Sequence, residues 1–266
     1  MPYASVNTIK LYYELEGSGK RVLLLNGRGG DLRNPRYPLQ EKLAASFEVL
    51  TYDHRGQGRS DNPEGPYNAE ILADDAAGLM DALGWENCAV IGPSMGGFVA
   101  QYLAARHPDR VTKLVLVVTY PGGKEGKRFP ADQLEGLPLS EYIARTMQML
   151  DTRWDAAWQA ANPGVVDLFS AMTTAQRKAR EDNPAIDRST WNQLKLASTI
   201  DTTAIMPSIH VPTYIISGRY DGLLPAENAP LMARLIPGAI YDIVDHGHIS
   251  WGFDPAVAEK IISFLS

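Results

Sequence analysis

The alternation of short apolar runs with longer helical patterns constrains the fold of this chain more than any other feature. Segments with helical spacing, such as residues 69–83, separate most of the runs. Apolar runs rich in Val, Ile and Leu are typical of strands buried on both faces of a sheet. The alternation therefore predicts an α/β fold, with a mostly parallel sheet wrapped by helices on both faces. The six runs are residues 22–25, 48–52, 88–91, 114–119, 214–217 and 240–244.

Two other segments complete the expected organisation. Residues 3–17 contain two β-rich pieces around Asn7 and Thr8, which predict an opening hairpin. The interval from residue 120 to residue 210 has no convincing strand and is too long for an ordinary loop. We therefore expect a core domain of residues 1–120 and 211–266 and a helical cap, or lid, of residues 121–210. The segments of this cap with helical spacing are residues 140–150, 153–161, 165–181 and 188–199.

Composition and charge exclude several classes of function. Of the 266 residues, 45% are hydrophobic and 21% charged, which is typical of a globular protein with a substantial core. A net charge of −6 without basic runs argues against nucleic acid or an anionic membrane as partner. Cys88 is the only cysteine, which excludes an intrachain disulfide and a cysteine-based metal cluster. Since no run approaches the roughly 20 apolar residues that span a bilayer, we expect a cytoplasmic protein. We also expect that it needs neither a cofactor nor a metal.

Ser94 stands at a junction that suits a catalytic nucleophile. The apolar run "CAVIG" ends at Gly92, and a helical pattern begins at Met95. A serine on so sharp a turn needs neighbours with almost no side chain, and Gly92 and Gly96 lie two residues to either side. This is the G-x-S-x-G nucleophile elbow in its expected context. The turn exposes the hydroxyl and places the Met95 amide at a helix N-terminus, where it can stabilise an oxyanion.

A serine hydroxyl needs a general base, and histidine is the usual one. Two histidines, His246 and His248, lie in a loop after the last predicted strand. We favour His248, because Gly247 allows the loop to turn the ring inward. The remaining histidines have simpler explanations in a turn, at a helix end and at a strand entry: His54, His107 and His210.

The base in turn needs an acid that orients it. Asp221 follows the strand at residues 214–217 in a loop closed by Pro225, and it lies between the serine and the histidine in the chain. Asp242 and Asp245 compete, but they are too close to His248 in sequence to lie in a separate loop. Ser94, Asp221 and His248 then stand at one edge of the sheet, where open α/β folds place their sites.

These motifs together resemble the α/β-hydrolases. The resemblance runs in order from about residue 3 to residue 265 outside the insertion, and it implies a mostly parallel eight-stranded sheet with helices on both faces and a helical cap. The matching stretches are "GPSMGG", "SGRYDGLLP", "HGHIS" and "YDHRGQGRSD".

A narrower resemblance concerns the loop that follows Leu25. The stretch "NGRGGDLRNPRYPLQ" and the later "FEVLTYDHRGQGRS" are similar to the enol-lactonase and lactonase/esterase branch of that family. The resemblance implies that this loop supplies the second oxyanion N–H, from Arg28 or, next to it, Gly27. Many relatives have histidine where this chain has Asn26, so the hydrogen bonds inside the loop must differ. The Arg28 side chain can contact a substrate carboxylate or, as the simpler interpretation, point to solvent.

Several large side chains of the insertion could line an apolar substrate pocket. Aromatic and methionine side chains at helical spacing are also what a packed core contains, so both interpretations remain open. The residues predicted to contact substrate are Gly27, Trp154, Trp158, Trp191 and Met147, and Met149 is a further candidate for the lining.

The function predicted from these residues is a serine hydrolase that cleaves an ester or lactone of a small, largely apolar molecule. Ser94 attacks the carbonyl, His248 is the base, Asp221 orients it, and the amides of Met95 and Arg28 hold the oxyanion. Carbon–carbon bond hydrolases and cofactor-free perhydrolases or haloperoxidases of the same fold share these groups and remain alternatives. A ligand-binding protein without turnover is a third possibility, and the oligomeric state is not predicted.

Overall fold

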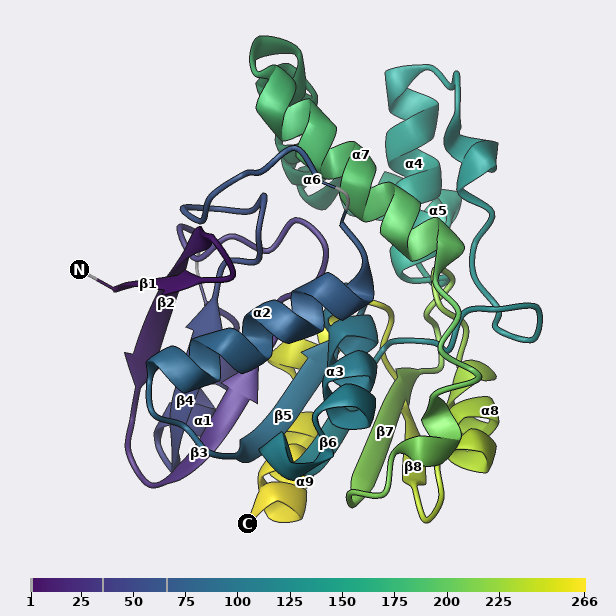
Figure 1. The fold of residues 1–266 in the computed structure, drawn as a ribbon. Helices are drawn as coiled ribbons and strands as arrows, with labels where there is room; N and C mark the ends of the chain where they lie inside the picture. Colours follow the sequence, from purple (N-terminus) through teal and green to yellow (C-terminus); the bar gives the residue numbers. More distant parts are fainter. Residues whose placement is uncertain (1, 35, 66) are drawn as a thin grey trace.

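The sheet is the framework of the molecule (Figure 1). The computed structural model describes residues 2–34, 36–65 and 67–266, and within them eight strands form one sheet in the order β1-β2-β4-β3-β5-β6-β7-β8. The β1–β2 and β2–β4 pairs are antiparallel and all the other pairs are parallel. The strands are β1 (Tyr3–Val6), β2 (Ile9–Glu16), β3 (Lys20–Leu24), β4 (Phe47–Tyr52), β5 (Cys88–Pro93), β6 (Val111–Val117), β7 (Thr213–Gly218) and β8 (Ile240–Val244).

Helices cover both faces of this sheet, as predicted. Helices α2, α3 and α8 pack against one face, and α1 and α9 against the other. Alternate residues of a strand point to opposite faces, so Val90 of β5 lies in the first apolar layer and Ile91 in the second. The helices are α1 (Pro38–Ala44), α2 (Ala69–Ala82), α3 (Met95–Arg106), α4 (Leu139–Leu150), α5 (Ala156–Ala161), α6 (Pro163–Asp182), α7 (Pro184–Thr199), α8 (Asn228–Leu235) and α9 (Pro255–Leu265).

The opening hairpin is confirmed, with Asn7 and Thr8 as its turn residues. Their φ angles are 45° and 69°, the left-handed values that a two-residue hairpin turn of type I′ requires. Asparagine tolerates this conformation well, whereas β-branched threonine is strained by it. Val6 pairs with Ile9 across the turn, so the turn fixes the register of β1 and β2.

The C-terminal end predicted for the fourth apolar run is wrong. The run was expected to remain a strand through residue 119, but β6 ends at Val117. The next residue, Val118, has φ of 42°, which is incompatible with an extended strand. The chain therefore turns away from the sheet two residues earlier than apolarity alone predicts.

The segment between β6 and β7 forms the predicted helices. Figure 1 shows α4, α5, α6 and α7 grouped over the edge of the sheet at which β5 ends. Within the described residues, α6 has no buried side chain, whereas α7 buries Ser189, Gln193 and Leu196. Helix α4 also has buried side chains, namely Ile143, Met147 and Met149, so α4 and α7 are the cap helices with a buried face. The limits of residues 121–210 for the cap stay a prediction.

A buried ion pair and a neighbouring hydrogen bond connect three elements near the edge of the sheet. The Arg55 guanidinium, in the loop after β4, donates two hydrogen bonds of 2.6 Å to the Asp75 carboxylate of α2. Asn7 of the hairpin turn donates a third, of 3.1 Å, to the same carboxylate. Since the Asp75 side chain is fully buried, its charge depends on these donors.

Replacing Arg55 should therefore be costly. In Arg55→Met the Asp75 charge stays buried without its counterion, so we expect the free energy of unfolding to fall by about 3–5 kcal/mol. Urea unfolding of both proteins at pH 7 measures the difference. The matched control is Arg106→Met, because the Arg106–Asp74 pair is well exposed and should contribute no more than about 1 kcal/mol. Equal effects of the two substitutions would contradict the argument.

Candidate active site

Ser94 occupies a strained turn between β5 and α3. Its φ and ψ are 51° and −120°, a region that residues other than glycine rarely adopt. The turn closes only because its neighbours lack side chains. A Cβ atom on Gly92 would lie 2.5 Å from the Gly96 carbonyl oxygen, and one on Gly96 would lie 2.8 Å from the Asn26 oxygen. Ser94 itself stays half-buried, with its hydroxyl free to contact other groups.

The structure brings Ser94, His248 and Asp221 together in one hydrogen-bonded chain. His248 Nδ1 lies 2.7 Å from Asp221 Oδ2, and His248 Nε2 lies 3.0 Å from Ser94 Oγ. A carboxylate only accepts hydrogen bonds, so the ring hydrogen belongs on Nδ1. Nε2 is then left to accept the hydrogen bond that the serine hydroxyl donates.

The Asp221 carboxylate is itself fixed in place. Its second oxygen, Oδ1, accepts hydrogen bonds from the backbone N–H groups of Leu223 (2.9 Å) and Leu224 (2.8 Å). Only 3% of the residue is exposed, so water does not compete for these bonds. Both oxygens are therefore occupied, and the carboxylate presents one of them to the histidine ring.

The cap contributes to the position of His248. The His248 backbone N–H donates a hydrogen bond of 2.6 Å to the carbonyl of Leu150, the last residue of α4. The indole of Trp251 donates another, of 3.1 Å, to the His248 carbonyl. No sequence pattern signals the contact with Leu150, because it joins segments almost 100 residues apart.

The competing acids and the neighbouring histidine have other partners. Asp242 accepts a hydrogen bond of 2.7 Å from the Tyr214 hydroxyl, and Asp245 accepts one of 2.6 Å from Arg219. His246 contacts Asp254, the N-cap of α9, at 2.6 Å, and this hydrogen bond lowers the pKa of Asp254. These contacts leave His248 and Asp221 as the pair that meets the serine.

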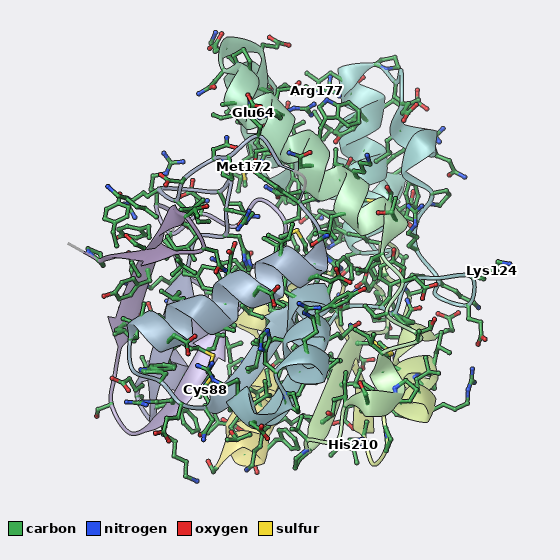
Figure 2. The ribbon with its side chains drawn as sticks, in the orientation of Figure 1. Glu64, Cys88, Lys124, Met172, Arg177 and His210 are labelled. Carbon is green, nitrogen blue, oxygen red and sulfur yellow. The ribbon has the colours of Figure 1, made fainter. Side chains whose placement is uncertain are left out.

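The remaining histidines lie outside this chain of hydrogen bonds. His107 ends α3 and contacts Asp74 at 2.8 Å. Figure 2 shows His210 at the end of the molecule opposite the cap helices. His54 is buried next to the loop that follows β3, where it contacts Asn26. Within the described residues, no group of three or more His, Cys, Asp or Glu side chains is arranged to hold a metal ion.

The two predicted oxyanion donors flank the serine. Met95 begins α3, so its N–H lies in the first turn, where no helical acceptor exists. Arg28 follows Gly27, and a Cβ atom added to Gly27 would lie only 3.6 Å from the Ser94 Cβ. Among the described residues, neither the Met95 nor the Arg28 N–H donates a hydrogen bond. Both amides are therefore available, and their role as donors stays a prediction.

Asn26 and His54 hold the base of the Arg28 loop. The Asn26 amide donates a hydrogen bond of 2.9 Å to the Tyr52 carbonyl at the end of β4. His54 Nε2 donates one of 3.2 Å to the Asn26 carbonyl. His54 is 1% exposed, and burial lowers its pKa to about 4. The hydrogen bonds of Asn26 and His54 thus connect the loop to the end of the sheet.

Helix α7 of the cap is joined to the same loop by buried polar side chains. Gln193 Oε1 accepts a hydrogen bond of 3.0 Å from the Gly29 N–H, and its amide lies 3.0 Å from the amide of Gln57. One turn earlier, the Ser189 hydroxyl donates to the Gly56 carbonyl. Gln193 and Ser189 are 5% and 2% exposed. Sequence analysis missed both residues, since polar residues on an amphipathic helix normally face water.

The predicted substrate contacts differ in their surroundings. Met147 is fully buried, whereas Trp191 is 57% exposed and lies beside Arg180. Trp154 and Trp158 are half-buried and stack on each other, with ring centroids 5.2 Å apart. Contact of these residues with a substrate stays a prediction, as it does for Gly27. Within the described residues, no helix combines the length and apolarity needed to cross a membrane.

Comparisons with known proteins show the family to which the chain is similar. The family model described as the alpha/beta hydrolase fold matches residues 20–255. The protein named "Putative carbamate hydrolase RutD" of Azorhizobium caulinodans is 30% identical over 93% of this chain and 91% of its own. The "Putative non-heme chloroperoxidase" of Synechocystis sp. is 30% identical over the whole of both chains. The crystal structure of the enol-lactonase from Burkholderia xenovorans LB400 superposes with a TM-score of 0.77, at 28% identity over 99% of each chain.

The burial of His54 should make the free energy of unfolding depend on pH. Its pKa is about 4 in the folded protein and about 6.5 when unfolded, so between these values the unfolded chain binds more protons. Its contribution to stability is complete above pH 6.5 and is lost as pH falls toward 4, by about 1.4 kcal/mol per pH unit. From pH 7 to pH 4.5, His54→Gln should therefore lose about 2–3 kcal/mol less stability than the wild type.

The measurement is urea unfolding at both pH values. The exposed His210 supplies the control, because His210→Gln should leave the pH dependence as in the wild type. An unchanged pH dependence in His54→Gln would show that His54 is not the residue responsible.

Proposed function

The chain belongs to the α/β-hydrolase family, and on that basis we propose that it is a serine hydrolase that cleaves a small carboxylic ester or lactone through an acyl-enzyme. The observation that carries the proposal is the unbroken chain of hydrogen bonds from Asp221 through His248 to Ser94. It matches the roles that such catalysis requires, namely an attacking hydroxyl, a base within hydrogen-bond reach and an acid that orients the base.

In the first half of the reaction, His248 Nε2 takes the hydroxyl proton as Ser94 Oγ attacks the carbonyl carbon. The carbonyl oxygen becomes negative and accepts hydrogen bonds from the amides of Met95 and Arg28. Asp221 stabilises the imidazolium that forms. The imidazolium then gives its proton to the leaving alcohol, and the acyl group stays on Ser94.

In the second half, His248 accepts a proton from a water molecule that attacks the acyl-enzyme. The same two amides hold the second oxyanion, and collapse of this intermediate releases the acid and restores the serine hydroxyl. Residues 121–210 act in this proposal as a cap over the site, since α4 ends at the His248 backbone and α7 contacts the Arg28 loop.

The structural likeness to an enol-lactonase supports an ester or lactone as substrate. The second candidate is peroxide chemistry at the same serine, which the name of the Synechocystis relative favours. Carbon–carbon bond cleavage would use the same three residues, and ligand binding without turnover is a further alternative. A panel of p-nitrophenyl esters, lactones, carbamates and a vinylogous diketone, assayed with and without peroxide, separates these activities.

Loss of the nucleophile tests the proposal directly. A fluorophosphonate probe should label the wild type at Ser94 and should not label Ser94→Ala. Ester hydrolysis by Ser94→Ala should fall by about 10⁴–10⁶-fold, because only binding and the oxyanion donors remain. Asp221→Asn should lose about 10⁴-fold, because an amide can stabilise the wrong tautomer of His248.

The controls are variants at the competing side chains. Asp245→Asn and His246→Gln should keep wild-type labelling, since neither residue contacts Ser94 or His248 through its side chain. A folded wild type that reacts with no probe and cleaves no ester in the panel would refute the esterase proposal and favour the binding function.

A further inference from the structure

The C-terminal end of α4 lies between the two loops that carry Asp221 and His248. It continues as a cap turn of residues 149–153, which contacts the acid loop of residues 219–225 and the histidine loop of residues 245–250. The proposed catalysis depends on the position of both loops, because each supplies one member of the catalytic chain of hydrogen bonds. Any contact that fixes the two loops relative to each other therefore bears on the chemistry.

Three backbone hydrogen bonds join these segments in a closed ring. The Thr152 N–H of the cap turn donates to the Tyr220 carbonyl at 2.9 Å, and the Tyr220 N–H donates to the His246 carbonyl at 3.0 Å. The histidine loop completes the ring, because the His248 N–H donates to the Leu150 carbonyl at 2.6 Å. The cap turn is thus bonded to both loops, and the two loops are bonded to each other.

Each loop has a glycine where the cap turn touches it. A Cβ atom on Gly222 of the acid loop would lie 2.9 Å from the Met149 carbonyl oxygen. One on Gly247 of the histidine loop would lie 2.7 Å from Oδ2 of Asp151. Real Cβ atoms do not approach other atoms so closely, so the backbone of both loops is in direct contact with the cap turn.

Asp151 places a buried charge in the cap turn. Its side chain is 1% exposed, and in the described part of the chain its carboxylate accepts hydrogen bonds only from Arg153. They come from the backbone N–H (3.1 Å), from Nε (2.9 Å) and from Nη2 (2.6 Å). The same guanidinium lies over the Tyr220 ring, 4.2 Å from its centre. Arg153 thus links the buried charge to the acid loop.

The need to end a helix does not explain Asp151. It is the C-cap of α4, where the helix dipole disfavours a negative charge, and burial of the carboxylate adds a desolvation cost. A turn in which the side chain accepts the N–H two residues on is common for aspartate. Such a turn also forms in water and needs no guanidinium, so the buried ion pair has a role besides the turn.

We propose that Asp151 and Arg153 are positioning residues, whose ion pair keeps the cap turn packed between the acid loop and the histidine loop. The ion pair thereby holds the base, His248, in line with Asp221 and Ser94. The inference rests on the proposed function and adds two residues to its site. Both residues act through the backbone contacts of the cap turn and not through contact with the substrate.

Loss of the guanidinium should disturb this arrangement from the cap side. In Arg153→Met the Asp151 charge stays buried without its counterion, which is strongly unfavourable. The carboxylate regains hydration only if the cap turn moves away from the loops, and the Leu150 carbonyl then no longer holds the His248 N–H. A misplacement of about 1 Å can cost about 100-fold in rate.

The first experiment observes the histidine without turnover. In protein that carries isotope-labelled histidine, the NMR signal of the His248 Nδ1–H reports the hydrogen bond to Asp221, and the signal is assigned by its absence from His248→Gln. In Arg153→Met this signal should shift and weaken, because the bond to the carboxylate is disturbed. The same substitution made in Asp151→Asn should change the signal little, since no buried charge is left to compensate.

The second experiment measures the reactivity of Ser94. The second-order rate constant for labelling by a fluorophosphonate should fall about 10–100-fold in Arg153→Met. It should fall by less in Arg153→Lys, which keeps the charge but not the planar fork of the guanidinium. The matched control is Arg145→Met, because Arg145 forms an exposed ion pair with Glu141 on the same helix. This control should be labelled as fast as the wild type.

A merely structural ion pair gives a different result. Arg153→Met would then unfold at a lower temperature, whereas the His248 signal and the labelling rate of the folded protein would stay as in the wild type, and the proposal would be overturned. An effect of Arg153→Met that is equally large in the Asp151→Asn background would overturn it as well. If the wild type is not labelled at all, the proposed function fails, and the NMR signal still decides the role of the ion pair. If Arg153→Met does not fold, Arg153→Lys carries both measurements, with smaller losses of the same kind expected.

Discussion

The strained turn at Ser94 is the constraint on which the rest of the site depends. A serine with φ of 51° costs on the order of 1–3 kcal/mol, so the surrounding contacts must impose it. They do so from both sides, because Ser94 N–H donates to the Val117 carbonyl and the Thr119 hydroxyl donates to the Ser94 carbonyl. The turn directs the hydroxyl to the edge of the sheet and begins α3 immediately behind it. Gly92 and Gly96 are the two positions where a side chain would prevent this.

Much of the fold could be predicted because it follows from local patterns. The apolar runs, the Asn7–Thr8 turn and the glycines around Ser94 each determine structure within about ten residues. The positions of Asp221 and His248 could be predicted for a different reason. Loops that follow parallel strands emerge at the same edge of a sheet, so residues distant in sequence meet there without any pattern that links them.

The contacts of the cap could not be predicted in this way. Helical spacing predicts a helix over residues 188–199 but does not say that Gln193 and Ser189 are buried or that they meet the loops at Gly29 and Gly56. Nor does it distinguish the buried Met147 from the exposed Trp191. These outcomes depend on how a helix packs against loops that lie more than a hundred residues away in the sequence. A sequence taken alone does not specify which residues meet in such a contact.

Residues 26–32 show why this docking matters for the chemistry. An oxyanion donor is effective only if it is already oriented before the charge develops, and this stretch has no helix or strand to hold it. Three separate elements replace that support, since His54 bonds to Asn26, α7 bonds to Gly29 through Gln193, and the Asp53 carboxylate accepts a hydrogen bond of 2.8 Å from Leu32. Because one of these supports comes from the cap, movement of α7 would change the position of the proposed oxyanion donor at Arg28. The fold thus couples coverage of the site to the proposed catalysis.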